Sequence, residues 1–279
     1  GVENVAMGYN ALSNNTTGSN NTANGYQALY SNTTGSYSSA IGREALYAAT
    51  TGGSNIAVGF QSLKNTTTGT FNTAVGIQSL LNNTTANNNT AIGRRALYSN
   101  TTASNNTAVG YYALYSNTTG TSNTALGSDT LTLNTTGANN TAVGKQALDA
   151  NTTGAENTAN GYQSLYANTT GSRNTAMGYG AMAANTTGQY NTAVGFGALA
   201  NHTTGNYVTC LGYAAVPSST TVANEITLGN ASVTNLRCND TSISSLSDER
   251  DKTNIVDIPL GLDFINTLRP VSFDWNRRD

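Results

Sequence analysis

The sequence predicts an all-β fold, a parallel β-roll or solenoid built from coils of seventeen residues. One glycine recurs at a constant spacing of 17 residues through fourteen copies, without insertion or deletion. A Thr-Thr pair keeps the same phase in twelve copies, from Thr16-Thr17 to Thr203-Thr204. Each copy also joins a strand-like run to a turn-like run. A fixed period near 20 residues is typical of solenoids, in which each unit covers the next.

The recurring glycine defines the repeat over residues 1–231, which we expect to form a β-roll shaft. It is never replaced within the chain, which suggests a close backbone approach as well as an unusual conformation. The glycine occupies positions Gly8, Gly25, Gly42, Gly59, Gly76, Gly93, Gly110, Gly127, Gly144, Gly161, Gly178, Gly195, Gly212 and Gly229.

The run before this glycine has strand character, as in Asn-Thr-Ala-Val-Gly at residues 106–110. Side chains alternate along a strand, so Thr107 and Val109 face one way while Ala108 and Gly110 face the other. The run after it, Tyr-Ala-Leu-Tyr, carries a regular leucine such as Leu114 and is expected to form a second short strand. We expect Val109-type and Leu114-type side chains to supply the apolar core.

The Asn-Thr-Thr-Gly stretch that completes each copy is typical of a turn, because Asn and Thr bond nearby backbone and Gly accepts positive φ. Ala86 and Ala103 replace this second glycine, so the turn cannot require positive φ strictly. Two short strands and two turns suit seventeen residues. A three-sided coil ranks second, since its period is usually divisible by three. Stacked identical Asn and Thr residues are expected to form side-chain ladders.

The repeat predicts association of chains. Two large apolar residues per coil are too few to offset the ordering of seventeen residues. The small face of Ala108 and Gly110 allows another chain to pack closely, so we expect a homotrimer with three such faces around an axis. About thirteen coils at roughly 4.8 Å each give a rod of roughly 60 Å.

Composition excludes several functions. The net charge of −2 gives no electrostatic basis for binding nucleic acid. No segment approaches 18 consecutive apolar residues, so we expect no membrane insertion. The repeats hold no His, Asp and Glu constellation, so we expect no metal, no cofactor and no enzymatic site in them.

A few residues depart from the repeat. Cys210 occupies an alanine slot and is expected to pack as a small apolar residue. His202 occupies an asparagine slot and is expected at the surface of a turn. Asn24 and Asn160 interrupt the valine column, where they either bond backbone at a weak coil or hold an ion at the axis. Aromatic residues recur after the first glycine, where they either pack along the rim or bind a saccharide.

The run Asn89-Thr90-Ala91-Ile92-Gly93 resembles the Ser-Val-Ala-Ile-Gly units in the heads of trimeric autotransporter adhesins. Those heads are left-handed parallel β-rolls assembled as trimers. Their usual unit is shorter than seventeen residues, so the resemblance supports the architecture and not the identity of the chain.

Composition changes near the C-terminal end of the repeats. Residues 1–231 carry 12 charged side chains and residues 232–279 carry 14. We expect a β neck over 232–247 and a short α+β segment over 248–279, with a helix from Pro259 to Leu268 and a strand from Val271 to Trp275.

Two motifs in this C-terminal part carry a second resemblance. They are Ser-Asp-Glu-Arg-x-Lys-x-Asn-Ile from Ser247 and Leu-Arg-Pro-Val-x-Phe-x-Trp from Leu268. Together they resemble the opening of the endosialidase-type intramolecular chaperone, the S74 self-cleaving peptidase family, which is longer than this segment. The resemblance implies trimerisation and scission at Ser247–Asp248, with Ser247 as catalytic serine and Lys252 as its partner. Such domains occur on phage tail fibres, tailspikes and neck appendages.

Two features of this sequence limit the self-cleavage that the resemblance implies. Asp251 stands where leucine is expected, and an acid beside Lys252 favours its charged form and weakens it as a base. This favours slow cleavage or none. Attack by Ser247 on its own carbonyl requires a four-membered ring, so scission needs a water, a group of another chain or the Asp248 carboxylate. Without the resemblance, Ser247 is a plain helix N-cap or turn residue.

Together these features predict a structural fibre of a phage tail or appendage, located on the virion and not an enzyme apart from single-turnover self-cleavage. Its expected partners are two further copies of the chain, an upstream tail or baseplate component, and a glycan or protein receptor on the host surface. The alternatives are a trimeric adhesin on a bacterial surface and an ice-binding β-solenoid. The second lacks the usual Thr-x-Thr rank, since its Thr pairs are adjacent and lie in turns.

Overall fold

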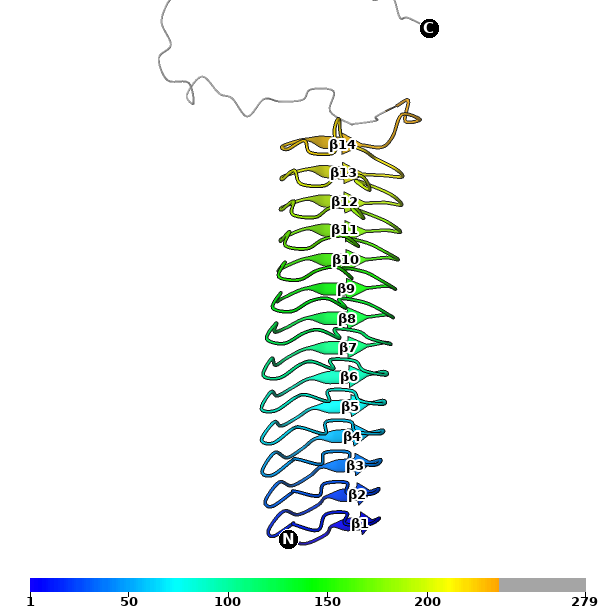
Figure 1. The fold of residues 1–279 in the computed structure, drawn as a ribbon. Coiled ribbons are helices and arrows are strands. Elements are labelled where there is room, and N and C mark those ends of the chain that lie inside the picture. Colours follow the sequence, from blue (N-terminus) through cyan, green and yellow to red (C-terminus); the bar gives the residue numbers. More distant parts are fainter. Residues whose placement is uncertain (236–279) are drawn as a thin grey trace, which may run out of the picture. The chain divides into compact units, whose positions relative to one another are not determined.

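The computed structural model describes residues 1–235, of which residues 1–234 form one compact column of stacked coils (Figure 1). Each coil contributes one strand, and each strand pairs in parallel with the next strand along the chain. The strands are β1 (Val5–Met7), β2 (Thr22–Asn24), β3 (Ser39–Ile41), β4 (Ile56–Val58), β5 (Thr73–Val75), β6 (Thr90–Ile92), β7 (Thr107–Val109), β8 (Thr124–Leu126), β9 (Thr141–Val143), β10 (Thr158–Asn160), β11 (Thr175–Met177), β12 (Thr192–Val194), β13 (Thr209–Leu211) and β14 (Ile226–Leu228).

The sheet register confirms the parallel solenoid and its seventeen-residue period. Between β7 and β8, Thr107 pairs with Thr124 and Ala108 pairs with Ala125, so each residue lies over its counterpart 17 positions later. Every other pair of neighbouring strands keeps this register. Stacking in phase places like residues in columns along the whole unit.

The expected assignment of the two strand faces was wrong. Ala108 is fully buried inside the coil, whereas Thr107 and Val109 point outward and are only partly covered. The Ala column packs in one core cluster with the Leu114 column and with Ala113 from the opposite run. The interior of a seventeen-residue coil is narrow, so one wall takes alanine and the other takes leucine. The alanine face is therefore core, and it does not offer another chain a contact surface.

The run Tyr-Ala-Leu-Tyr forms a turn and not the expected second strand. Tyr112 and Leu114 have φ angles of 55° and 52°, in the left-handed region. A non-glycine residue there costs roughly 1–2 kcal/mol. Two features offset this cost: the Leu114 side chain is fully buried, and its amide donates to the Thr130 carbonyl of the next coil at 3.0 Å. Each coil therefore has one strand and a long turning segment.

The first glycine combines the two constraints predicted for it. Gly76 has φ of +140°, a conformation that favours glycine strongly. A Cβ on Gly76 would lie 2.5 Å from the Gly93 oxygen and 2.7 Å from its carbonyl carbon. Close stacking of the backbone and positive φ therefore both exclude a side chain here.

Two asparagine ladders close each coil. Asn106 and Asn117 both donate from Nδ2 to the Gly120 carbonyl at 2.9 Å, one from each end of the coil. Asn117 also donates to Oδ1 of Asn100 in the preceding coil at 3.0 Å. These buried amides satisfy one another and the turn carbonyl, so the asparagine of the Asn-Thr-Thr-Gly stretch has a structural role.

The second of these ladders breaks where the asparagine is replaced. His202 is fully buried, so its predicted surface position was wrong. Its Nε2 bonds the Gly205 oxygen at 3.0 Å, as an asparagine would, but its Nδ1 has no partner. Asn185 Oδ1, one coil below, is left unpaired as well, and Asn32 Oδ1 is unpaired below Ala49. Each orphan oxygen thus lies next to a residue that cannot continue the ladder.

Candidate functional site

The outer strand face is formed by the first and third residues of β1–β14, which point away from the core. Two outward residues on each of fourteen strands give 28 side chains, and none of them is charged. The third positions form a column of twelve apolar residues and two asparagines. The apolar members are Met7, Ile41, Val58, Val75, Ile92, Val109, Leu126, Val143, Met177, Val194, Leu211 and Leu228.

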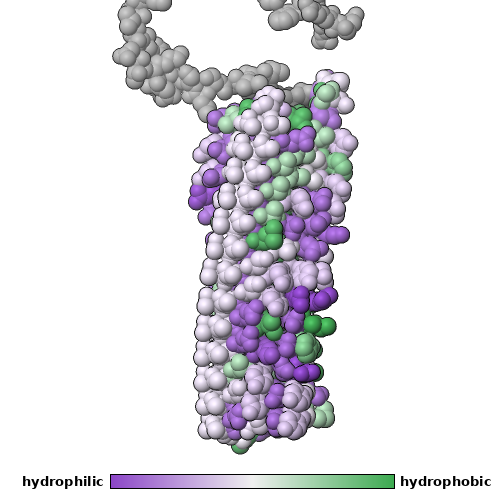
Figure 2. Space-filling view, in the orientation of Figure 1, coloured by the Kyte–Doolittle hydropathy of each residue, from purple (hydrophilic) through white to green (hydrophobic). Residues whose placement is uncertain are grey.

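This face leaves large apolar side chains in solvent. Ile92, Leu126 and Met177 are 40%, 38% and 43% exposed. Figure 2 shows one side of the column, where green hydrophobic patches lie beside hydrophilic ones and beside a pale band of near-neutral residues. A partly exposed apolar stripe along a column, here interrupted by Asn24 and Asn160, marks an interaction surface more often than isolated apolar residues do.

Asn24 and Asn160 lie in this outer column. Asn24 is half-buried and Asn160 is exposed, and their side chains take part in none of the hydrogen bonds of the described residues. Both side chains point outward, so they hold no ion inside the coil, and an ion at an axis between chains stays a prediction. Neither does Asn24 or Asn160 bond backbone in the described structure.

The ion-paired residues of the described chain lie outside the outer strand face. Lys64 Nζ lies 2.6 Å from Glu44 Oε2, and Arg173 Nε lies 2.8 Å from Glu156 Oε2. The hydrogen bond from Lys64, with a further one from Gln61, holds the pKa of Glu44 below its usual value. These pairs connect neighbouring coils and give no cluster of free charge for catalysis.

Aromatic rings stack on one another beside the strands. Tyr162, Tyr179, Phe196 and Tyr213 form a run with centroid separations of 5.0, 4.9 and 5.5 Å and interplanar angles of 21° or less. Each inner ring therefore turns its faces to its neighbours and its edge to solvent. This geometry favours packing along the rim over stacking on a saccharide.

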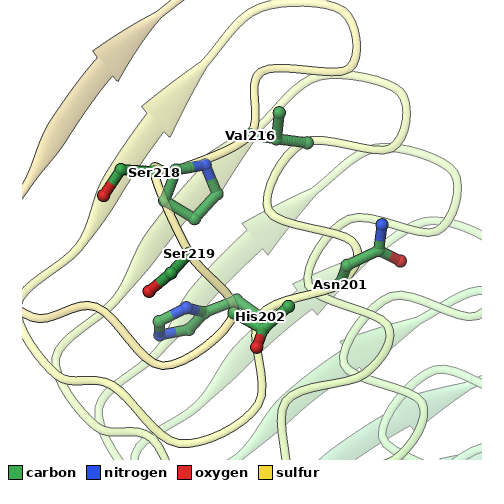
Figure 3. A pocket seen from close by; sticks show the side chains of 7 residues that line it. Asn201, His202, Val216, Ser218 and Ser219 are labelled. Atoms are coloured by element: carbon green, nitrogen blue, oxygen red, sulfur yellow. The ribbon is translucent and has the colours of Figure 1, made fainter.

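A hollow of about 250 Å³ lies at the last coils, where the repeat loses its pattern (Figure 3). Its lining comes from Asn201 and His202 of one coil and from residues 216–220 of the next. Ser218 donates to Glu225 from its amide at 2.8 Å and from Oγ at 2.5 Å, which lowers the pKa of Glu225. Beside these groups the hollow offers Val216 and Pro217, and no acid–base pair faces it.

No metal site or membrane-spanning helix is evident in residues 1–235. No group of three His, Cys, Asp or Glu residues in this range is arranged to hold a metal ion. Nor does this part of the chain contain a helix with the length and apolar character needed to cross a membrane. Cys210 is fully buried in its alanine slot, as predicted, and burial raises the pKa of its thiol.

The C-terminal residues of the chain match the model of a known protein family. Residues 247–279 match the model of the Peptidase S74 family, described as the chaperone of endosialidase. The match confirms the resemblance predicted from the two C-terminal motifs. It covers the last 33 residues and leaves the coils outside it. No curated protein and no solved structure matches the chain.

The residues predicted for self-cleavage lie outside the described structure. Ser247, Asp248 and Lys252 fall inside the S74 match, and their catalytic roles stay predictions. The predicted neck over 232–247 and the segment over 248–279 also lie almost wholly outside the described residues.

Sequence reasoning missed the outer strand face as a surface of its own. Its signal was present in the alignment of the chain with itself: across fourteen copies, the strand positions hold none of the chain's charged residues. The hollow beside His202 could not be found this way, because it results from how the irregular residues 216–220 fold over the column.

Proposed function

We propose that this chain is the shaft of a phage tail fibre or tail appendage that mediates attachment to a host surface. The observation that carries the proposal is the succession within one chain of a long rigid β-solenoid and a match to the chaperone of endosialidase. A column of stacked coils projects its end far from its attachment point, and a chaperone that follows it can align the copies of a fibre.

The proposal includes three chains. The exposed apolar stripe and the chaperone match both support assembly, and a shaft made of three columns resists bending better than one column. Uncleaved chains of 28.8 kDa predict a trimer of 86.4 kDa by sedimentation equilibrium, and scission after Ser247 lowers this mass. A species of 28.8 kDa for the folded protein contradicts the trimer.

The proposal also includes maturation by scission between Ser247 and Asp248. The test is expression from the whole gene, followed by a denaturing gel and intact mass measurement. We expect a fragment that ends at Ser247 and its loss in a Ser247→Ala variant, with Glu249→Ala as the neighbouring control. A chain that stays whole in all three proteins contradicts the scission while leaving the shaft untouched.

Attachment is tested with the assembled protein and a panel of bacterial strains. Fluorescently labelled fibre is expected to bind a subset of strains, and excess unlabelled fibre is expected to compete with it. Immunogold labelling then separates the two locations. Gold on phage tails supports the tail fibre and its junction with an upstream tail or baseplate component. Gold on uninfected cells favours the bacterial surface adhesin.

A further inference from the structure

We infer that the outer strand face is where copies of this chain meet, parallel and level with one another, and that Asn24 and Asn160 face their own counterparts across that contact. The inference rests on the homo-oligomer of the proposed function and adds which surface forms it. It also replaces the alanine face, which the structure places in the core.

The size of the face fits a contact between chains. Thirteen steps of about 4.8 Å and a width of about 10 Å for a three-residue strand with its side chains give about 600 Å² per chain. Two such faces bury about 1,200 Å² in total, which is the lower end of stable protein interfaces. The aromatic columns beside the strands add to this area wherever two columns lie close.

The chemical character of the outer strand face also fits a contact with another copy of the chain. The 28 outward positions carry no charge, and the column at the third strand positions is apolar in twelve of its fourteen members. Charge depletion is typical of the core of an interface. The charged residues stand beside the face, as Arg43 and Glu156 do, where a polar rim belongs.

The repeat spacing of the outer strand face indicates that its partner is a second copy of the chain. Its side chains repeat once per coil over fourteen strands. A partner has to repeat at the same spacing to keep contact along the full length. A copy of this chain does so by construction, since every coil meets an equivalent coil. A compact receptor of another fold can match only a few coils.

The two asparagines select the parallel arrangement. In a parallel, level assembly whose axis runs along the third strand positions, Asn24 faces Asn24 and Asn160 faces Asn160, so each amide finds an amide with which to exchange hydrogen bonds. In an antiparallel assembly β2 lies opposite β13 and β10 opposite β5. Asn24 then faces Leu211 and Asn160 faces Val75, which leaves two polar groups covered by apolar side chains. A buried Asn fixes register in coiled coils by the same means.

Cross-linking of the full 279-residue chain tests the contact. Cys210→Ala and Cys238→Ser provide a background free of native thiols. Asn24→Cys reports on the outer strand face, and Thr34→Cys, exposed on another side of the same coil, is the matched control. After treatment with a short bismaleimide, we expect at least tenfold more cross-linked chains from Asn24→Cys than from Thr34→Cys. Co-expressed Asn24→Cys and Leu211→Cys chains are expected to give no mixed product beyond that of the control.

A charge at the same place tests whether the asparagines meet. No titratable group occupies the outer strand face, and Arg43 lies beside it. Asn24→Asp therefore brings carboxylates together at neutral pH. We expect the Asn24→Asp assembly to melt at a lower temperature than the parent at pH 7 and at the parent temperature near pH 3. Thr34→Asp is expected to show no such difference.

The outcomes separate this inference from the proposed function. A trimer that cross-links through Thr34→Cys and not through Asn24→Cys overturns the choice of face and leaves the fibre standing. A mixed Asn24→Cys and Leu211→Cys product, or Asn24→Asp without pH-dependent melting, overturns the level, parallel pairing. A folded monomer overturns both this contact and the trimer of the proposed function.

Discussion

Replacing the first glycine of a coil by alanine tests the stacking geometry most severely. Gly76→Ala places a Cβ 2.5 Å from the Gly93 oxygen, on a backbone with φ of +140°. A non-glycine residue in such a region costs roughly 1–3 kcal/mol. Moving the Gly93 peptide also disturbs the Gly93 amide bond to Val75 and the Ala96 amide bond to Gly93. At roughly 0.5–1.5 kcal/mol each, these two bonds bring the total to about 2–6 kcal/mol.

Gly69→Ala is a matched control. Its Cβ also lies 2.5 Å from a backbone oxygen of the next coil, that of Ala86, but its φ is not positive. Alanine already occupies this column at positions 86 and 103, so the coil accommodates a methyl group there by a small shift. We expect a change within about 1 kcal/mol, which includes the entropy that alanine removes from the unfolded chain.

Native-state hydrogen exchange is the suitable assay, because long repeat arrays depart from two-state unfolding. At about 1.4 kcal/mol per factor of ten, Gly76→Ala is expected to speed exchange of the Gly93 amide by roughly 30-fold to 20,000-fold. Gly69→Ala is expected to change exchange in its own coil by less than about tenfold. Equal loss of protection in the two variants refutes the argument that φ and stacking act together at the first glycine.

Three further predictions concern the asparagine ladder, the leucine column and the half-buried Asp149. His202→Asn and Ala49→Asn each continue the asparagine ladder over an unpaired amide oxygen, and each is expected to stabilise the column by about 1–3 kcal/mol in thermal or chemical unfolding; a loss of stability contradicts the ladder. Leu114→Ala removes a fully buried side chain and is expected to cost about 2–5 kcal/mol, whereas Leu133→Ala, at a half-exposed leucine, is expected to cost far less. Burial raises the pKa of Asp149 in the folded chain, so its charge destabilises the fold at neutral pH and stability rises as pH falls through that pKa. Asp149→Asn is therefore expected to raise the melting temperature at pH 7 and to lose this advantage near pH 3; an advantage that persists in acid contradicts the assignment.

The period alone predicted the stacking, because a constant spacing admits one register for all coils. It also predicted the burial of Leu114 and Cys210, since each shares a column with residues of one kind. The side of the strand that faces inward was not predictable in this way. A three-residue strand such as Thr107–Val109 has one small and one larger face, and side-chain size favoured burying Val109. The interior of the coil is too narrow for valine on this wall, so Ala108 is buried in place of Val109. This narrowness becomes evident only once the run opposite the strand is known to form a turn.

The turn at Tyr112–Leu114 escaped sequence reasoning because Tyr, Ala and Leu carry no left-handed preference. The local signals were Gly180 and Gly197, with φ of 60° and 61° in the column of the left-handed residue, and Asn10 and Asp129, which share that column and belong to types enriched in this region. The position of His202 was predicted wrongly because the prediction considered the histidine alone and not the asparagines at the equivalent position of the other coils. The neighbouring asparagines are buried, and the column would have predicted a buried histidine. The S74 motifs could be recognised from the sequence because they are defined by side-chain identity at fixed spacing and not by a fold.

Cryo-electron microscopy of the assembled full-length protein tests the central claim most directly. A shaft of three parallel columns predicts a rod in which the fourteen coils span about 62 Å, with a repeat of about 4.8 Å along its axis. Cross-sections are expected to show three coils at the same level, with their strands toward the common axis. A single column, or chains offset along the rod, contradicts the account.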